Sequence, residues 1–309
     1  TRATAIDRDN SMLKLHSGSG DAELQYDRLV LALGADARVF PVEGSGSVDI
    51  FTVNDLDDYR NWRQKIGQRG RVLLIGAGLI GCEFANDLAD AGFEVALVDP
   101  APWPLARLLP REIGEMLATA LQKRGCRLYL GQKVVRYGGD ASGSIAELDD
   151  GASLAFDHAL SAVGLKARTS LAKQAGLDVG EGIIIDRTMR TSDPRIFALG
   201  DCAQSEAGVL PFIAPLLAEA KTLAAILTGD ARELQFPAMP VIVKTPALPL
   251  VLSSPPPGAK GEWQVEVQEE GAVALHRAAD GSESGFVLAG KKTVMQQQLA
   301  KRMPDLLPA

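Results

Sequence analysis

A glycine-rich hexapeptide, GAGLIG, follows an apolar run and precedes a stretch that is typical of a helix. Its glycines are Gly76, Gly78 and Gly81. The first permits a tight turn, the second lets a pyrophosphate approach the backbone, and the third lets the helix pack on the preceding strand. Phosphates then bind the unpaired N–H groups at the helix start, aided by the helix dipole. The pattern predicts a dinucleotide site, with Leu79 and Ile80 in the same turn.

An acidic residue, Asp99, ends the next predicted strand, eighteen residues after Gly81. At this place in a dinucleotide site, a carboxylate binds the 2′-hydroxyl of the ribose. The same carboxylate would repel the 2′-phosphate of NADP, and no lysine or arginine follows before Arg107. The pattern therefore predicts NAD as the bound nucleotide.

A second acidic residue, Glu83, lies in the first turns of the helix that follows the glycines. One interpretation is an acid that the helix dipole stabilises near the helix N-terminus. The other is a carboxylate that points toward the nicotinamide. The residues alone leave both interpretations open.

The cysteines and histidines are scattered and form no metal-binding or disulfide pattern. Cys82, Cys126 and Cys202 contain no CxxC pair, which fits a reducing cytoplasm. We expect Cys82 and Cys202 to fill tight packing and not to act as redox thiols. The three histidines of the chain are equally far apart, so no metal centre is expected.

Composition excludes several classes of partner. The net charge of -7 argues against nucleic acid, because phosphate binding needs a basic surface. No apolar run is long enough to span a bilayer, and the first ten residues lack the apolar region of an export signal. With 309 residues, 46% of them hydrophobic, the chain has the length for two or three globular domains.

The glycine turn lies within an alternation of predicted strands and helices. Residues 54–68 have helical character, with Asn54 as the expected cap. Such alternation implies a parallel sheet with right-handed crossovers, and residues 133–163 add hairpins that end in an apolar strand. The further elements expected here are strands 71–76 and 94–99 and helices 79–91 and 111–124.

The chain changes character after Gly164. Two strands are predicted in 182–203, then a helix that begins near Pro215 and is closed by Gly229. The proline-rich stretch 235–257 has the composition of a domain junction. The remaining residues predict a small α+β domain, with alternating strands over 262–290 and a helix near 293–303.

Three short motifs relate the chain to a known family. TSDPRIFALGDCA places Asp201 at the end of an apolar strand, while LVLALGA contains Gly34 and LSAVGLKAR contains Gly164. In this order they resemble the flavoprotein reductases of the pyridine nucleotide-disulfide oxidoreductase superfamily, which have two dinucleotide-binding domains. The resemblance implies that Asp201 binds the ribityl chain of FAD. It also implies that the other two motifs mark the crossings between the FAD and NAD domains, with Gly34 in contact with FAD and Gly164 in contact with NAD.

The resemblance implies an α/β fold with two Rossmann-like, three-layer dinucleotide-binding domains and a small α+β C-terminal domain. The FAD domain would comprise residues 1–37 and 164–240, with the NAD domain, 38–163, inserted, and 241–309 would form the C-terminal domain. The family's first glycine fingerprint is missing from this sequence. We therefore expect that residue 1 is not the natural start, that roughly 75 residues carrying the FAD phosphate site are missing, and that this chain alone holds FAD poorly.

Within the superfamily, disulfide chemistry is disfavoured, because the chain has no CxxC or CxxxxC and its last domain has only His276, without an HP motif. The chain most resembles the bacterial branch whose members pass electrons from NADH through FAD to rubredoxin, over its whole length, including FPAMPVIVKTPALP. This implies a cytoplasmic electron-transport enzyme. The alternatives are a ferredoxin reductase, an NADH oxidase, a CoA-disulfide reductase, or a non-enzymatic NAD-binding module.

The same resemblance gives roles to two charged residues and one helix start. Lys244, the only charge in MPVIVKTPALPL, would pair with Glu83 near the reactive edge of FAD and stabilise the reduced flavin. The helix near Pro215 would direct its N-terminus at the pyrimidine end of the flavin. The expected contacts there are Phe212, Ile213, Ala214, Pro215 and Leu216.

Overall fold

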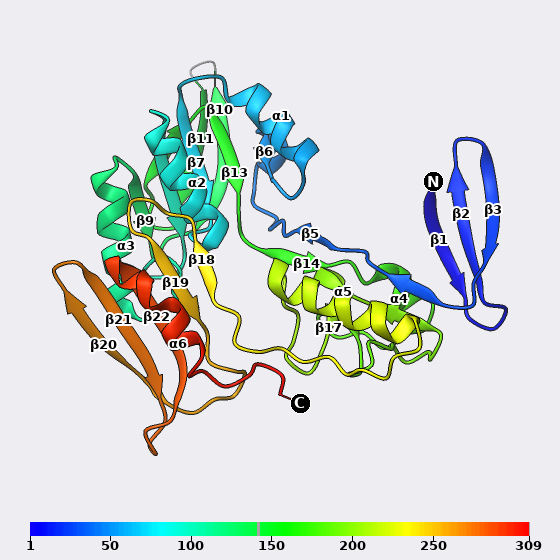
Figure 1. The fold of residues 1–309 in the computed structure, drawn as a ribbon. Coiled ribbons are helices and arrows are strands. Elements are labelled where there is room, and N and C mark those ends of the chain that lie inside the picture. The colour runs from blue at the N-terminus through cyan, green and yellow to red at the C-terminus, as the bar shows by residue number, and fades with distance from the viewer. Residues whose placement is uncertain (141–142, 309) are drawn as a thin grey trace. The chain divides into compact units, whose positions relative to one another are not determined.

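The computed structural model describes residues 1–140 and 143–308 and forms two compact units. The first unit contains Thr1–Asp36, Lys166–Met239 and the segment that begins at Pro304, and the second contains Ala37–Leu165 and Pro240–Met303. The chain therefore leaves the first unit and returns to it twice. Two of these four crossings are made in strands β5 (Ala35–Ala37) and β14 (Leu165–Ala167), which pair with each other (Figure 1).

A five-stranded parallel sheet forms the centre of the second unit, in the order β6-β13-β7-β8-β9. Helices follow β6, β7 and β8 along the chain, which confirms the predicted alternation (Figure 1). The first helix is capped by Asp55, whose carboxylate accepts two backbone N–H groups, and not by Asn54 as predicted. The elements are β6 (Ile50–Phe51), α1 (Leu56–Ile66), β7 (Arg71–Ile75), α2 (Leu79–Asp90), β8 (Glu94–Asp99), α3 (Arg111–Lys123), β9 (Arg127–Leu130) and β13 (His158–Ser161).

The parallel sheet is covered on one face by helices and on the other by a three-stranded antiparallel sheet. Alternate residues of β7 show this, because Val72 and Leu74 pack with the helices whereas Leu73 packs with the antiparallel sheet. The predicted hairpins of residues 133–163 thus supply the third layer. Its strands are β10 (Val134–Asp140), β11 (Gly143–Leu148) and β12 (Ser153–Phe156).

The second unit also contains a five-stranded antiparallel sheet, in the order β18-β19-β22-β21-β20. Two of its strands lie in the proline-rich stretch where the sequence predicted only a junction. The predicted helix near 293–303 is shorter, since a 3-10 turn, η3 (Lys291–Met295), precedes α6 (Gln296–Ala300) and Pro304 disfavours a longer helix. The strands are β18 (Val241–Val243), β19 (Leu250–Ser253), β20 (Glu262–Gln268), β21 (Gly271–Arg277) and β22 (Glu283–Gly290).

The first unit consists of small sheets, two helices and a separate buried core. Strands β4 and β16 pair in parallel, and helix α5 begins at Ile213, close to the predicted start. The apolar stretch 26–35 is a strand over only the three residues of β4, and Gly34 further along it has φ of 68°. The elements are β1 (Arg2–Asp7), β2 (Met12–Ser17), β3 (Gly20–Gln25), β4 (Leu29–Leu31), α4 (Ser170–Gln174), β15 (Ile183–Ile184), β16 (Ile196–Ala198), η2 (Gly200–Cys202), β17 (Ala203–Gln204) and α5 (Ile213–Leu227).

The last described residues return to the core of the first unit. Phe236 is fully buried, and its backbone exchanges two hydrogen bonds with Leu307, of 2.9 and 3.0 Å. The core of this unit is therefore closed by segments about seventy residues apart in the chain.

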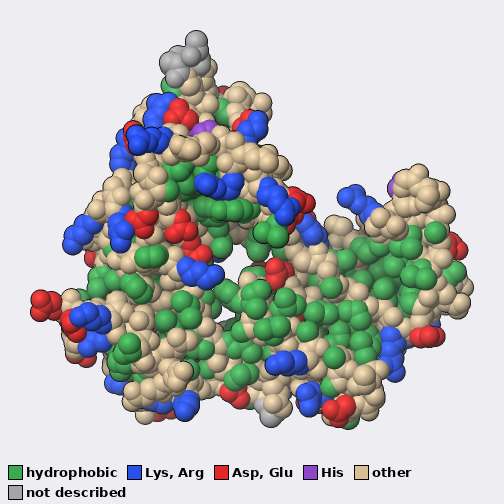
Figure 2. Space-filling view, turned by 45° about the horizontal axis from the view of Figure 1, so that its top comes forward, with side chains coloured by type: hydrophobic (Ala, Val, Ile, Leu, Met, Phe, Trp, Pro, Cys, Tyr) green, Lys and Arg blue, Asp and Glu red, His purple; other side chains and the backbone are tan. Residues whose placement is uncertain are grey.

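Basic and acidic side chains are intermixed over the face shown in Figure 2. Among the described residues, no helix is long and apolar enough to cross a membrane.

Candidate functional site

The glycine turn between β7 and α2 is tightly packed at Gly76 and Gly81 and open at Gly78. A Cβ at Gly81 would lie 1.8 Å from the carbonyl oxygen of Gly76, so only glycine lets the helix begin this close to the strand. Gly76 itself has φ of 103°, and its Cβ would lie 2.6 Å from the oxygen of Ala162. At Gly78, in contrast, no described residue other than its chain neighbours comes within 4 Å of an added Cβ. The turn is therefore closed on the protein side and open at Gly78, which fits the approach of a pyrophosphate.

The backbone of Ala77, inside the turn, is held from both sides. Asp99 accepts its N–H at 2.6 Å through Oδ2, and also accepts the N–H of Ala101 at 2.7 Å through Oδ1. The carbonyl oxygen of Ala77 accepts the N–H of Leu105 at 2.9 Å. Asp99 thus shapes the turn, a role that the sequence did not predict. Its predicted role as the ribose ligand stays a prediction.

The other predicted NAD contacts lie around the same turn. Leu79 and Ile80 form the first turn of α2, and Ile80 is 51% exposed. The first helical hydrogen bond runs from the N–H of Cys82 to the oxygen of Gly78, so the N–H groups before it lie at the helix start. Gly164 follows β13, the neighbour of β7, and has φ of 103°.

Glu83 and Lys244 are brought together, but not as the predicted ion pair. The Oε1 atom of half-buried Glu83 accepts the backbone N–H of Lys244 at 2.8 Å. Their side chains form no ion pair in the described ranges, and the lysine is exposed. The physical reason is that β18 ends at Val243, so the N–H of Lys244 is free of the strand pairing and available to the carboxylate on α2.

One helical turn further along α2, Asn86 makes a second contact of the same kind. Its Oδ1 accepts the backbone N–H of Ala247 at 2.9 Å, and its Nδ2 donates to Asp90 at 3.1 Å. Asn86 is fully buried. Glu83 and Asn86 therefore hold the segment 244–247 at two points with matching spacing. Asn86 was not predicted from the sequence, although its place three residues after Glu83 puts both side chains on one helix face.

In the first unit, the predicted FAD residues Gly34 and Asp201 follow the paired strands β4 and β16. The N–H of Leu33 donates to the sulfur of Cys202 at 3.3 Å, which brings the ends of the two strands together. Asp201 is half-buried, and burial raises the pKa of its carboxyl group. The two residues therefore lie at one edge of the unit, where ligands bind in parallel sheets.

The N-terminus of helix α5 is the other predicted FAD contact. Phe212 is its N-cap residue, and no side chain of the described residues caps the helix, so its first N–H groups are open to a ligand. Ile213 and Ala214 are exposed, and Pro215 is buried. The Cδ1 atom of Leu216 would lie 3.2 Å from a Cβ at Gly200, which places this helix start beside the Gly200–Asp201 turn.

Helix α5 also contains a buried acid that the sequence analysis missed. Glu219 is 5% exposed and accepts the backbone N–H of Gly200 at 2.6 Å. Burial raises the pKa of its carboxyl group to about 7, and the charge of Asp201 adds to this effect. The sequence does single out this residue, because it is the only acidic one in a largely apolar helix.

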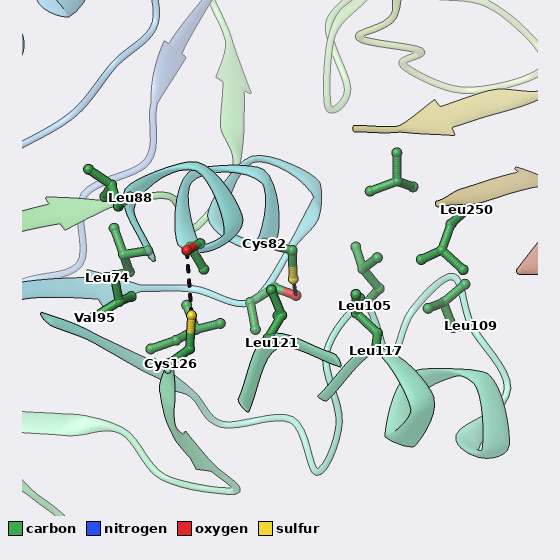
Figure 3. Packing of buried hydrophobic residues seen from close by; sticks show 14 of the residues in the cluster. Leu74, Cys82, Leu88, Val95, Leu105, Leu109, Leu117, Leu121, Cys126 and Leu250 are labelled. Atoms are coloured by element: carbon green, nitrogen blue, oxygen red, sulfur yellow. Dashed lines mark hydrogen bonds between the residues drawn. The ribbon is translucent and has the colours of Figure 1, made fainter. Parts of the chain in front are cut away.

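The three cysteines are free and buried, as expected for packing residues. Cys82 and Cys126 lie among leucines, and each thiol donates to a backbone oxygen, of Ala77 and Ala85 respectively (Figure 3). Burial raises the pKa of Cys126 to about 11 and also raises the pKa values of Cys82 and Cys202. Neutral, enclosed thiols of this kind are poor nucleophiles.

Two family matches cover most of the chain. Residues 1–220 match the family described as pyridine nucleotide-disulphide oxidoreductase. Residues 233–303 match the rubredoxin binding C-terminal domain. The second range includes Lys244 and Ala247, the two residues that α2 holds.

Two relatives in sequence carry the same name. The chain is 43% identical to the rubredoxin-NAD(+) reductase of Alcanivorax borkumensis, over 93% of this chain and 76% of that protein. It is 38% identical to the rubredoxin-NAD(+) reductase of Acinetobacter baylyi, over 100% of this chain and 80% of that protein.

Among solved structures, the chain is similar to a ferredoxin reductase from Rhodopseudomonas palustris. The TM-score is 0.87 at 28% identity, over 98% of this chain and 76% of that chain. Together with the family matches, this similarity confirms the predicted fold class of two dinucleotide-binding domains and a small C-terminal domain.

Proposed function

The chain belongs to the pyridine nucleotide-disulphide oxidoreductase family, and from that premise we propose that it is an FAD-dependent NADH:rubredoxin oxidoreductase. One observation carries the proposal: a rubredoxin-binding domain follows the nucleotide-binding region in the same chain. The chemistry that bound FAD supplies is acceptance of hydride from NADH and release of electrons one at a time. The protein itself needs no nucleophile, in agreement with its buried thiols.

We assign NADH to the glycine turn of the second unit. The pyrophosphate would lie at Gly78, where the turn is open, against the N–H groups that begin α2 at Leu79 and Ile80. Asp99 would bind the ribose hydroxyl while it holds Ala77, and its charge would favour NADH over NADPH. Gly164 would lie near the nicotinamide end.

We assign FAD to the edge of the first unit that bears Gly34, Asp201 and the start of α5. Asp201 would accept hydrogen bonds from the ribityl chain, and the uncapped N–H groups after Phe212 would face the pyrimidine end of the flavin. The proposed division into an FAD domain, an inserted NAD domain and a C-terminal rubredoxin-binding domain follows from these assignments.

Glu83 and Lys244 keep proposed roles in this scheme. Glu83 positions the segment that begins at Lys244 by accepting the backbone N–H of that lysine. The ammonium group of Lys244 therefore stays exposed. That ammonium is the proposed cation for the negative charge of the reduced flavin. The cytoplasm is the proposed location, because a reducing compartment suits three unpaired cysteines.

An anaerobic rapid-mixing experiment tests the function. NADH should bleach the visible absorption of the FAD-loaded protein, and oxidised rubredoxin should then restore it while its own iron absorption is lost. Failure of NADH to bleach the flavin would leave only an NAD-binding module. Bleaching followed by reoxidation with ferredoxin, oxygen or a disulfide, but not with rubredoxin, would assign the chain to a related flavoenzyme.

A further inference from the structure

The carboxyl group of Glu219 is enclosed in the first unit without a cation. Its side chain lies on the inner face of α5, is 5% exposed, and forms no ion pair in the part of the chain that the structure describes. The carboxylate of Asp201 and the thiol of Cys202, both on η2, interact electrostatically with it. Its own helix carries Lys221, which is exposed to solvent. Among the described residues, the N–H of Gly200 is therefore the hydrogen-bond donor that balances a negative charge on Glu219.

This environment makes the proton on Glu219 sensitive to nearby charge. Desolvation favours the neutral acid and the Gly200 N–H favours the carboxylate, so the pKa of Glu219 lies at about 7. Asp201, one residue from the bonded N–H, already shifts the equilibrium toward the neutral acid. A further negative charge placed beside Asp201 would shift it in the same direction, because like charges disfavour the ionised form.

Glu219 also joins the two segments that we assign to FAD. It belongs to α5, whose first turn is one of them, and it is hydrogen-bonded to Gly200 in the turn that holds Asp201, the other. Gly200 has φ of 75° and lies against Leu216 of the same helix. The carboxyl group of Glu219 is thus hydrogen-bonded to the backbone that would hold the flavin, so a change in its charge acts directly on that backbone.

We propose that Glu219 is a positioning residue whose proton occupancy rises when the flavin held by these two segments is reduced, and falls again on reoxidation. The inference rests on the proposed function. Reduction by NADH delivers two electrons and one proton to the flavin, which gains one negative charge, and Glu219 takes its proton from solvent. When the two electrons leave, one to each of two rubredoxins, the proton of the hydride and that of Glu219 return to solvent.

Proton uptake on reduction tests the proposal. The FAD-loaded protein is reduced electrochemically, and the protons bound per flavin are measured with an indicator dye between about pH 6 and pH 8. Wild type should take up a fraction of a proton more than Glu219→Gln, with the largest difference near pH 7. Its midpoint potential should accordingly fall more steeply with pH than that of the variant. Glu181→Gln, at an exposed position of the same unit, should behave as wild type.

Equal proton uptake in wild type and Glu219→Gln would overturn the inference. If Glu219→Gln does not fold, the infrared difference spectrum of wild type decides, because reduction should produce the C=O band of a protonated carboxyl group near neutral pH. A reduced-minus-oxidised spectrum without that band would also overturn it. Electrode reduction needs neither NADH nor rubredoxin, so failure of the proposed function is distinguished from failure of this inference.

Discussion

The carboxylate of Glu83 binds the backbone of Lys244 and not its ammonium group, with 2.8 Å between Oε1 and the amide nitrogen. A backbone donor is present whatever side chain stands at position 244. Together with the bond from Asn86 to Ala247, it attaches the helix of the glycine turn to the region that matches the rubredoxin-binding domain.

The first prediction separates this bond from an ion pair. Glu83→Ala should lower the free energy of unfolding by about 1–2 kcal/mol, because a hydrogen bond to a charged group is lost. Glu83→Gln should lose less, since its amide oxygen still accepts. Lys244→Ala keeps the amide N–H and should leave stability unchanged in urea titrations. An equal loss for Glu83→Ala and Lys244→Ala would contradict the backbone bond.

The second prediction concerns two glycines of one turn. Gly78 has φ of -77° and open space around an added Cβ, so Gly78→Ala should cost the fold only about 1 kcal/mol or less. The same methyl group would occupy the approach of the pyrophosphate and should weaken NADH binding by about tenfold or more. Gly81→Ala should instead destabilise the protein by about 1–3 kcal/mol, because its Cβ overlaps Gly76. NADH titrations and urea unfolding of both variants provide the check, and unchanged NADH affinity in Gly78→Ala would refute the assignment.

The third prediction concerns nucleotide choice at Asp99. Asp99→Asn removes the charge that repels a 2′-phosphate, so the ratio of kcat/KM for NADH to that for NADPH should fall by about tenfold. Some stability should also be lost, because an amide offers one acceptor oxygen and Asp99 accepts both Ala77 and Ala101. Steady-state kinetics with both nucleotides measure the ratio. If it does not change, Asp99 serves only to hold the turn.

The fourth prediction follows from the sign of the pKa shift at Glu219. Its folded-state pKa, about 7, lies above its ordinary value of 4.5, so the ionised residue destabilises the fold at high pH. Glu219→Gln should therefore be more stable than wild type above about pH 8, by on the order of 3 kcal/mol. The difference should shrink as pH falls through 7 and vanish below about pH 5. Urea unfolding at a series of pH values measures it, and a gap that does not depend on pH would speak against an ionised, buried Glu219.

The fifth prediction concerns the thiols. Cys82, Cys126 and Cys202 are buried and have raised pKa values, so none should be alkylated by iodoacetamide in the native protein. All three should react after unfolding. Peptide mass spectrometry of both samples locates the label, and native labelling of Cys82 or Cys202 would reopen a redox role.

The helices and strands near the glycine turn could be predicted from the local sequence pattern. Strand β8 occupies the predicted residues 94–99, and α2 begins at the predicted Leu79, because apolar runs and glycines act over short distances along the chain. Helix α5 was also located closely, by a proline in its first turn and Gly229 after its end.

The contacts of the candidate site could not be predicted in the same way, because most of them join residues far apart in the chain. Asn86 and Ala247 are separated by 161 residues, and no local sequence pattern near either residue indicates that it contacts the other. The backbone bond to Lys244 was mistaken for an ion pair, because residue types suggest side-chain partners and say nothing of a free amide at the end of a strand. Glu219 was missed because its partner is the N–H of Gly200, which every residue except proline possesses.

The backbone pairing of Phe236 with Leu307 bears on how the polypeptide folds as it leaves the ribosome. The parallel sheet of the second unit is contained in residues 50–161, so its strands can pair once that stretch has emerged. The core of the first unit must wait for Leu307, which is translated after every strand and helix described. The nascent chain would therefore expose the apolar surface around Phe236 until Leu307 has been synthesised, and exposed apolar surface of this kind promotes aggregation.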